Sequence, residues 1–282
     1  MTLTTNQSRP SIHALSLFLA LPAVAAAGAP TVPLTIHEAL VDDLAASSYT
    51  LVAGAERIAE PVTFGLPLPS SASVCAAAEV GLGGGATVGQ FRVLSRWSDG
   101  GCGGIGSVQW LLVDTQASLP AHGMHSAYAL TTGNGSFGGS PLASETATEI
   151  TVDTGFATFT LRKQGYNLLH QVVVGASTFL SPGTGGIELV ATDGTSFRSD
   201  LDPTSDVIIE ENGPARAVVR ARGSYLSAVG MRALDYTVRM HFYRGHGRVR
   251  VVHTLRNAST ALTDNLAFRS LELVLPTTLT NP

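Results

Sequence analysis

A dense set of arginines lies in the stretch 210–257 of a chain whose formal net charge is -4. A guanidinium group binds a carboxylate through two parallel hydrogen bonds, so clustered arginines favour an anionic ligand. A nearby histidine or tyrosine could then remove a proton that this charge neutralisation makes more acidic. The candidate bases are His241 and Tyr243, and the candidate binding residues are Arg239, Arg244, His246, Arg248 and Arg250.

Alternation of apolar and polar side chains predicts two strands that would position these residues. The pattern occupies 234–242, stops at the turn 245–247 with its two glycines, and resumes over 249–255. Because side chains alternate across a strand, Arg239 and His241 can share a face with arginines of the second strand. The two strands together predict a β-hairpin that carries a basic strip.

The same arginines have a purely structural interpretation, which we keep beside the functional one. Arginine on an exposed strand position keeps a sheet edge soluble and pairs with carboxylates, here Glu210, Glu211 and Asp235. A nucleic-acid partner is not expected, because the chain is acidic, with a pI near 6.0 and no lysine-rich run.

The composition is typical of short strands joined by tight turns. Only 13% of the 282 residues are charged, and the chain has 30 glycines and 14 prolines and no long amphipathic pattern. Short β-prone runs bounded by turn residues recur along the whole chain. We therefore predict an all-β protein with an N-terminal domain over 28–142, a small antiparallel barrel or sandwich, and a second strand-rich domain over 143–282. The flexible stretch 131–144 is the predicted linker.

Residues 1–27 have the pattern of a secretory signal peptide. Arg9 precedes an apolar run, and small residues near Ala27 resemble a cleavage site. The run is too short to span a membrane, and a retained N-terminal anchor or an internal helix is the alternative. We expect a secreted protein, extracellular or periplasmic, without a membrane partner after cleavage.

Cys75 and Cys102 are the only cysteines of the chain. An oxidising compartment would let them pair, and closing that loop would stabilise the protein by about 3–4 kcal/mol on the chain-entropy estimate. Two unpaired thiols are the alternative. A cysteine nucleophile is not expected, because Cys102 lies in a glycine run without an adjacent basic group.

Two other constellations have functional alternatives. Trp97 and Trp110 could stack on sugar rings, but we expect both to be core residues of a hairpin, because tryptophan is usually buried. The aspartates of 200–206 could bind calcium, but a solvated polar loop is the interpretation that we favour. No motif for a serine hydrolase, a zinc protease or a nucleotide-binding protein is present, and we expect no cofactor and no metal.

Two blocks of the sequence resemble the exo-rhamnogalacturonan lyase-like family. The segments 65–69, 90–100 and 107–114 resemble its N-terminal barrel domain. The segments 210–219, 239–245 and 249–257 resemble the first part of its central β-supersandwich domain. The blocks follow the family order, so the resemblance implies a barrel followed by a partial β-supersandwich. It also implies a carbohydrate-active protein whose partner is an acidic pectic polysaccharide or oligosaccharide, cleaved by β-elimination.

The sequence departs from the family pattern at two places. The insertion 101–106 remodels the turn after Asp99, and the C-terminal α/α toroid of the family does not follow the sandwich segment. We therefore expect a polypeptide that is incomplete as an enzyme, completed by a missing domain or by self-association through an open sheet edge at 271–275. A non-catalytic carbohydrate-binding or structural β-sandwich is the alternative function.

Overall fold

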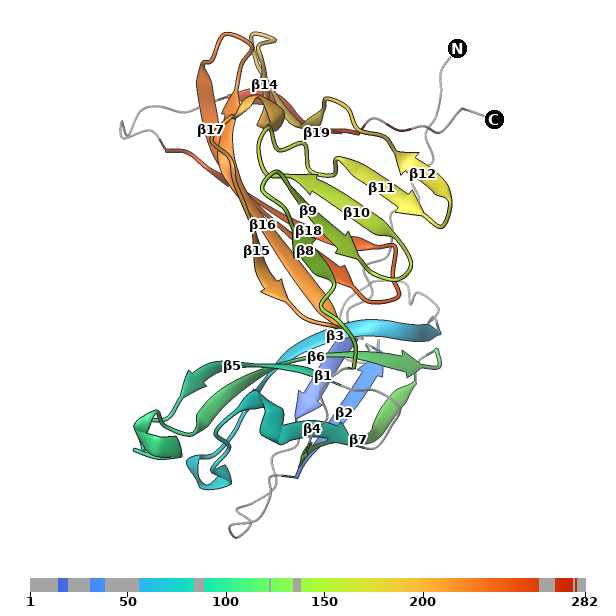
Figure 1. The fold of residues 1–282 in the computed structure, drawn as a ribbon, viewed down its shortest axis with the longest axis vertical. Helices are drawn as coiled ribbons and strands as arrows, with labels where there is room; N and C mark the ends of the chain where they lie inside the picture. Colours follow the sequence, from blue (N-terminus) through green and yellow to red (C-terminus); the bar gives the residue numbers. More distant parts are fainter. Residues whose placement is uncertain are drawn as a thin grey trace, which may run out of the picture. The chain divides into compact units, whose positions relative to one another are not determined.

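The protein consists of antiparallel sheets joined by short turns (Figure 1). The computed structural model describes residues 15–19, 31–38, 56–83, 89–121, 123–133, 138–258, 267–275 and 277. It divides the chain into two compact units, Met1–Phe137 and Gly138–Pro282. The prediction of an all-β fold is confirmed. In the part of the chain that the structure describes, no helix has the length and apolar character of a membrane span.

The first unit contains a four-stranded sheet in the order β1-β2-β7-β4 and a three-stranded sheet in the order β3-β6-β5. The strands are β1 (Leu15–Leu19), β2 (Val32–Glu38), β3 (Arg57–Pro67), β4 (Val80–Gly83), β5 (Gln90–Arg96), β6 (Val108–Leu119) and β7 (Met124–Thr132). Short 3-10 turns are η2 (Ser70–Ala72), η3 (Ala77–Glu79) and η4 (Cys102–Gly104). Apart from β1, the predicted signal segment 1–27 lies outside the described residues.

One apolar core lies between these two sheets. Leu34 and Leu130 from the four-stranded sheet and Leu66 and Leu111 from the three-stranded sheet are buried in the same cluster. β3 is an edge strand, and it carries Pro61 and Pro67. A proline lacks the N–H that an inner strand would need to donate on both sides, so the edge position explains the composition of β3.

The expectation that both tryptophans are core residues is wrong. Trp97 is 37% exposed and Trp110 is 41% exposed. The Trp110 ring lies against Gly65 of β3, where a Cβ would be 3.5 Å from the ring. The Trp97 indole N–H donates to the Leu68 carbonyl at 2.9 Å. A glycine neighbour and one backbone hydrogen bond thus hold the two rings at the surface.

Cys75 and Cys102 are joined in a disulfide in this structure, with a Cα–Cα distance of 5.3 Å. Cys102 begins η4, in the glycine-rich insertion, and Cys75 precedes η3. The bond ties these two connections together across 27 residues of sequence. It therefore restrains the turn that joins β5 to β6.

The second unit contains a five-stranded sheet in the order β12-β11-β10-β9-β8 and a seven-stranded sheet. In the larger sheet the order is β18-β17-β16-β14-β13-β19, and β15 also pairs with β16. The strands of the smaller sheet are β8 (Ala143–Glu145), β9 (Glu149–Asp153), β10 (Thr158–Arg162), β11 (Gln171–Val174) and β12 (Ser177–Leu180). Those of the larger sheet are β13 (Gly186–Ala191), β14 (Ser196–Arg198), β15 (Asp206–Asn212), β16 (Arg216–Leu226), β17 (Arg232–Tyr243), β18 (Val249–Arg256) and β19 (Phe268–Val274). The 3-10 turn η5 (Ser199–Leu201) follows β14.

The two sheets of this unit form a sandwich around a shared core. Ile150 and Leu161 of the smaller sheet are buried with Val219, Val238 and Met240 of the larger one. The alternation over 234–242 is confirmed, because all five of its apolar members are buried in β17. Every second side chain of β17 consequently lies on the opposite face of the sheet. β18 pairs with β17 as the predicted hairpin, but none of its residues is buried, and Val251, expected on the core face, is 42% exposed.

One edge of β16 has a gap between two partner strands. β15 pairs with β16 as far as Arg222, and β14 pairs with it only at Leu226. Between these points the backbone N–H of Ser224 donates to the carboxylate of Asp202 at 2.7 Å. Asp202 lies in the connection between η5 and β15 and is only 3% exposed. The expectation of a solvated loop over 200–206 is therefore wrong for Asp202, which replaces a strand partner in this gap.

Candidate functional site

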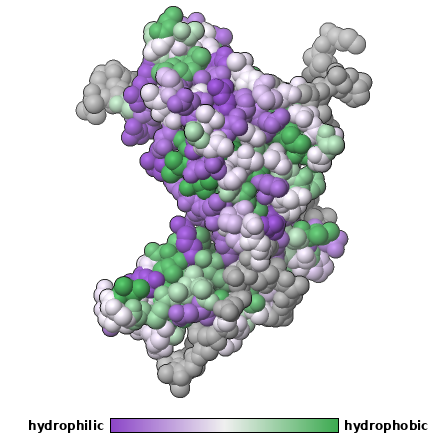
Figure 2. Space-filling model, viewed as in Figure 1, coloured by the Kyte–Doolittle hydropathy of each residue, from purple (hydrophilic) through white to green (hydrophobic). Residues whose placement is uncertain are grey.

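The face of β16–β18 that is turned away from the core carries most of the arginines that the sequence clusters. The strand register places Arg220 opposite Arg239, Ser224 opposite Asp235, and His241 opposite Arg250. Hydrophilic residues gather along the β15–β17 side of the second unit (Figure 2). We call this surface the polar face. Its members are Arg216, Arg220, Arg222, Ser224, Asp235, Thr237, Arg239, His241, Tyr243, Arg250, Thr254 and Arg256.

Two of the predicted binding arginines are bound to groups of the protein itself. The Arg239 guanidinium donates to both carboxylate oxygens of Glu210, at 2.6 and 2.9 Å. This hydrogen bonding lowers the pKa of Glu210. Arg244 donates to the Pro214 carbonyl and, at 2.8 Å, to the Ser140 carbonyl. Arg239 is therefore neutralised, and Arg244 fastens the end of β17 to neighbouring backbone.

The remaining predicted residues lie around the hairpin turn. His246 belongs to the turn, where its backbone N–H donates to the Tyr243 carbonyl at 3.2 Å. Arg248 precedes the first residue of β18 and is exposed. Arg250 is exposed on β18 and makes no ion pair within the described part of the chain. The structure thus brings Arg250 beside His241 and leaves the other predicted cations outside a common site.

His241 is neutral at physiological pH. Burial lowers the pKa of His241 to about 4, and the charges of Arg216 and Arg250 act in the same direction. Its Nδ1 is buried and has no hydrogen-bond partner among the described residues. The second candidate base, Tyr243, lies opposite Arg216, whose guanidinium pairs with Glu211. Of the two candidates, only His241 combines a neutral basic nitrogen with an exposed arginine opposite it.

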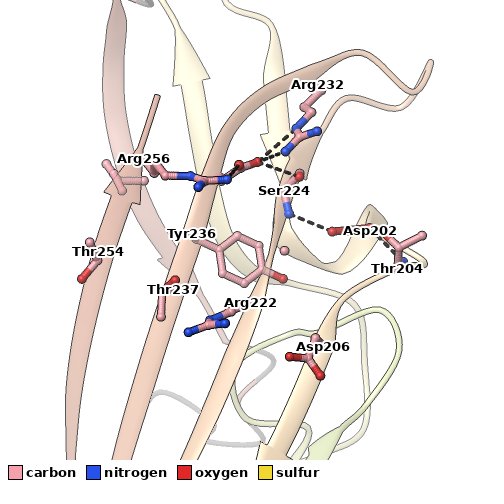
Figure 3. Close-up of a pocket in the computed structure, with 13 residues that line it drawn as sticks. Asp202, Thr204, Asp206, Arg222, Ser224, Arg232, Tyr236, Thr237, Thr254 and Arg256 are labelled. Carbon is pink, nitrogen blue, oxygen red and sulfur yellow. Dashed lines mark hydrogen bonds and ion pairs between the residues drawn. The ribbon is translucent and has the colours of Figure 1, made fainter. Parts of the chain in front are cut away.

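A pocket lies at the other end of the polar face (Figure 3). Its volume is about 720 Å³. The walls come from β16, β17, β18 and the connection between η5 and β15. The lining residues are Asp202, Thr204, Asp206, Arg222, Gly223, Ser224, Arg232, Asp235, Tyr236, Thr237, Thr254, Leu255 and Arg256.

Asp235 organises one side of this pocket. Its side chain is 9% exposed and accepts hydrogen bonds from Arg232, from Arg256 at 2.8 Å and from the Ser224 hydroxyl at 2.8 Å. Burial by itself would raise the pKa of Asp235, but these hydrogen bonds outweigh it and lower the pKa. One carboxylate thus holds two guanidinium groups, so this side of the pocket keeps a positive charge.

Arg222 is the available cation of the pocket. It is exposed, lies opposite Thr237, and makes no ion pair with any described residue. The nearby carboxylate of Asp206 is instead paired with Arg220 at 2.8 Å. An exposed guanidinium with five unused donors can bind a carboxylate in the bidentate geometry that this group favours.

Asp202 and Tyr236 also line the pocket, although the Tyr236 side chain belongs to the buried core face of β17. Asp202 accepts from the Thr204 backbone N–H at 2.8 Å, from the Thr204 hydroxyl at 2.7 Å, and from Ser224. The Tyr236 hydroxyl is buried and has no hydrogen-bond partner among the described residues. Within those residues, no group of three or more histidine, cysteine or acidic side chains could hold a metal ion.

Sequence reasoning missed the pocket, although two signals point to it. Gly223 is an isolated glycine inside a strand, which often marks the close approach of another group. The aspartate of 202–204 precedes a threonine by two residues, a spacing that allows the side chain to accept from the backbone of a turn. The density of arginines instead drew attention to the hairpin turn, at the opposite end of the same strands.

No curated protein matches this chain. A family model matches residues 142–274, which hold β8–β19 and with them the polar face and the pocket. The matching family is described as the PcRGLX-like protein central beta sandwich domain, and the match supports an RGLX-like family for this part of the chain.

Proposed function

We propose that this protein is an exported, carbohydrate-active protein that binds an acidic, pectic-type saccharide in the pocket of its second unit. Arg222 is the observation that carries the proposal, because it is an exposed cation without an ion pair in a pocket lined by polar groups. The similarity of 142–274 to the central domain of PcRGLX-like proteins supports the same class of ligand.

The charges of the pocket favour an anion. Asp235 is shared by Arg232 and Arg256, and Asp206 is neutralised by Arg220, so neither carboxylate repels an incoming carboxylate strongly. The third carboxylate, Asp202, is buried and accepts hydrogen bonds from Thr204 and Ser224. Arg222 would bind the carboxylate of a uronate residue through two hydrogen bonds. The pocket also offers the hydroxyls of Thr204, Thr237 and Thr254 to the sugar hydroxyls.

A matched pair of arginine variants tests this proposal. Arg222→Ala removes the available cation, whereas Arg239→Ala removes a cation that Glu210 already neutralises. A charge-assisted hydrogen bond contributes about 1.5–3 kcal/mol, so Arg222→Ala should weaken binding of oligogalacturonate by about tenfold to hundredfold. Arg239→Ala should change the affinity by less than about threefold.

Calorimetric titration of the full chain with oligogalacturonate and with rhamnogalacturonan fragments measures both affinities. Raising the ionic strength should weaken the wild type and leave little difference between it and Arg222→Ala, because salt screens exposed charges. The proposal fails if the wild type binds neither ligand. It also fails if Arg239→Ala weakens binding as much as Arg222→Ala does.

β-Elimination at the other end of the polar face is the second candidate function. The observation that favours it is the pairing of neutral His241 with exposed Arg250, a base beside a group that could offset a uronate carboxylate. Cleavage would release unsaturated uronides that absorb in the ultraviolet. His241→Gln should abolish that absorbance and His246→Gln should retain it, whereas no absorbance from the wild type would leave binding as the function.

A further inference from the structure

We propose that the outer face of the three-stranded sheet β3-β6-β5 (Figure 1) is a second saccharide-binding site, in which a pyranose ring stacks on the indole ring of Trp110. The site belongs to the first unit, whereas the pocket that contains Arg222 belongs to the second. It also lies outside residues 142–274, which the family model matches. The inference therefore goes beyond the proposed function and does not depend on it.

The strand register places Trp110 on the face of the sheet that is turned away from the core. Leu66 of β3 pairs with Leu111 of β6, and both side chains are buried in the core of this unit. Trp110 precedes Leu111 in the same strand, so its side chain projects from the opposite face. The residue is 41% exposed. Because tryptophan is usually buried, an exposed ring in the middle of a sheet needs a specific explanation.

Gly65 of β3 leaves one side of this ring uncovered. It pairs with Leu112, on the same face as Trp110, and it is exposed. A Cβ at Gly65 would lie 3.5 and 3.6 Å from two carbon atoms of the ring, an ordinary van der Waals contact, and the φ of Gly65 is not positive. The register has no bulge between Glu60 and Pro67 either.

Neither space nor backbone conformation therefore requires a glycine at position 65. Glycine weakens the interior of a strand, because it has no side chain to pack and loses more conformational entropy on folding. Besides bulges and bends, the role of such a glycine is to let another molecule or segment approach closely. A ligand that lies over the Trp110 ring accounts for Gly65, whereas packing within the sheet does not.

Hydrogen-bonding side chains border the ring on the same face. Ser95 of β5 lies opposite Trp110, and Arg92 lies opposite Leu112. The Ser95 hydroxyl donates to Oε1 of Gln109 at 3.1 Å, so its lone pairs can accept from a ligand. The Arg92 side chain is exposed, and a guanidinium group has enough N–H donors to bind a ligand in addition to a contact with the protein. An acceptor and several donors thus lie on the β5 side of the ring.

This arrangement is complementary to one sugar residue of a saccharide chain. A pyranose ring has a face of C–H groups, which the negative face of an indole ring attracts, and hydroxyl groups around its rim. Ser95 and Arg92 would bind those hydroxyl groups. A standard protein interface buries about 800 Å² on each partner, far more than one indole ring supplies. Because stacking needs no charge on the sugar, neutral and acidic chains should both bind.

The test compares oligogalacturonate with its fully methyl-esterified form, which has the same rings and linkages but no charge. Calorimetric titration of the full chain measures both affinities. Trp110→Ala should weaken binding of the ester by about tenfold or more, as truncation of a central tryptophan commonly does. Ile58→Ala is the matched control, because it removes a 70% exposed apolar side chain from the other end of β3 and should not change the affinity.

Charge separates this site from the pocket. Arg222→Ala should leave binding of the ester unchanged, and high ionic strength should weaken only the pocket. If the wild type binds oligogalacturonate through Arg222 but does not bind the ester, the stacking site is refuted and the proposed function stands. If the wild type binds the ester and Arg222→Ala weakens neither ligand, the proposed function is refuted and the stacking site stands.

Two further measurements keep the proposal testable if Trp110→Ala does not fold. Gly65→Leu keeps the ring and sets a side chain against it, so it should also weaken binding of the ester by about tenfold. Wild-type affinity in this variant would refute the site. Sedimentation of the wild type and Gly65→Leu examines the other occupant, since a dimer that becomes a monomer in the variant would assign this face to a second copy of the chain.

Discussion

The two ends of the polar face carry similar residues and differ in what their arginines contact. At the hairpin-turn end, Arg239 is bidentate to Glu210, Arg216 pairs with Glu211, and Arg244 binds backbone carbonyls. At the pocket end, Arg222 makes no ion pair with a described residue, although it lies on the same strand as Arg216. The number of arginines in a sequence therefore says less about ligand binding than the carboxylates that the register places beside each one.

Geometry explains this difference. The β-bulge between Ile209 and Glu211 brings two consecutive glutamates toward the arginines of β16 and β17. β15 begins at Asp206 and therefore offers no further carboxylate beyond Arg222, where β16 has its gap. A short neighbouring strand thus leaves one cation available and opens the space for a pocket.

The largest expected effect that distinguishes the two ends is the pH dependence of stability that His241 causes. The pKa of His241 is about 4 in the folded protein, against an ordinary value of 6.5 for an unperturbed histidine. Between these values the unfolded chain binds a proton that the folded chain does not, so the free energy of unfolding decreases as the pH falls from 6.5 to 4. The decrease should be about 2–3 kcal/mol, since a tenfold difference in proton affinity corresponds to about 1.4 kcal/mol.

Urea denaturation of wild type and His241→Gln at several pH values in this range measures the effect. The variant should lose most of the slope. A smaller slope should remain from His170 and His253, because burial lowers the pKa of both. His246→Gln, in the adjacent turn, should retain the slope of the wild type. An unchanged slope in His241→Gln would show that this end of the face is hydrated.

The next effect compares the carboxylates that anchor arginines at the two ends. Asp235 is 9% exposed and accepts from Arg232, Arg256 and Ser224, whereas the Glu210 side chain is 28% exposed and its partner Arg239 is 39% exposed. Asp235→Ala should lower the free energy of unfolding by about 2 kcal/mol, because it removes charge-assisted hydrogen bonds from a buried acceptor.

Glu210→Ala should cost less than about 1 kcal/mol, since solvent screens the exposed pair. Chemical denaturation at neutral pH gives both values. The pKa of Asp235 is lowered in the folded state, so its contribution is present above its unfolded value of 3.8 and is lost as the pH falls below it. If both variants lost the same free energy of unfolding, burial of the carboxylate would not explain a difference between the two ends of the polar face.

Much of the second unit could be predicted from its sequence, and the pocket could not. Alternation over 234–242 identifies β17 and its buried face, because a period of two is a local property. The pocket depends instead on Asp202 reaching the gap in β16, 22 residues away in sequence, and on a register that sets Asp235 beside Arg256. Such contacts follow from strand pairing, which single-strand patterns do not encode.

The tryptophans of the first unit also show that a local sequence signal does not determine where a side chain lies. Tryptophan is usually buried, and that average predicted a core position for Trp110. The register instead places Trp110 beside Pro67 and against Gly65, on the side of β6 away from the core. Residue type alone therefore cannot assign a face of the strand here.

The smallest expected effect comes from a variant that leaves Arg239 without its carboxylate partner, as Arg222 already is. Glu210→Gln removes the charge that neutralises Arg239, and Arg220 also lies within 3.9 Å of this carboxylate. If contacts with carboxylates determine which arginines bind ligand, the variant should bind oligogalacturonate about twofold more tightly at low salt, an exposed-charge effect of about 0.5 kcal/mol. The gain in affinity should vanish at high ionic strength.

Glu145→Gln is the control, because it removes the partner of Lys163 on the other sheet and should produce no gain in affinity. An affinity that Glu210→Gln leaves unchanged at low salt would mean that the ligand never reaches the hairpin-turn end, and that the pocket alone accounts for binding.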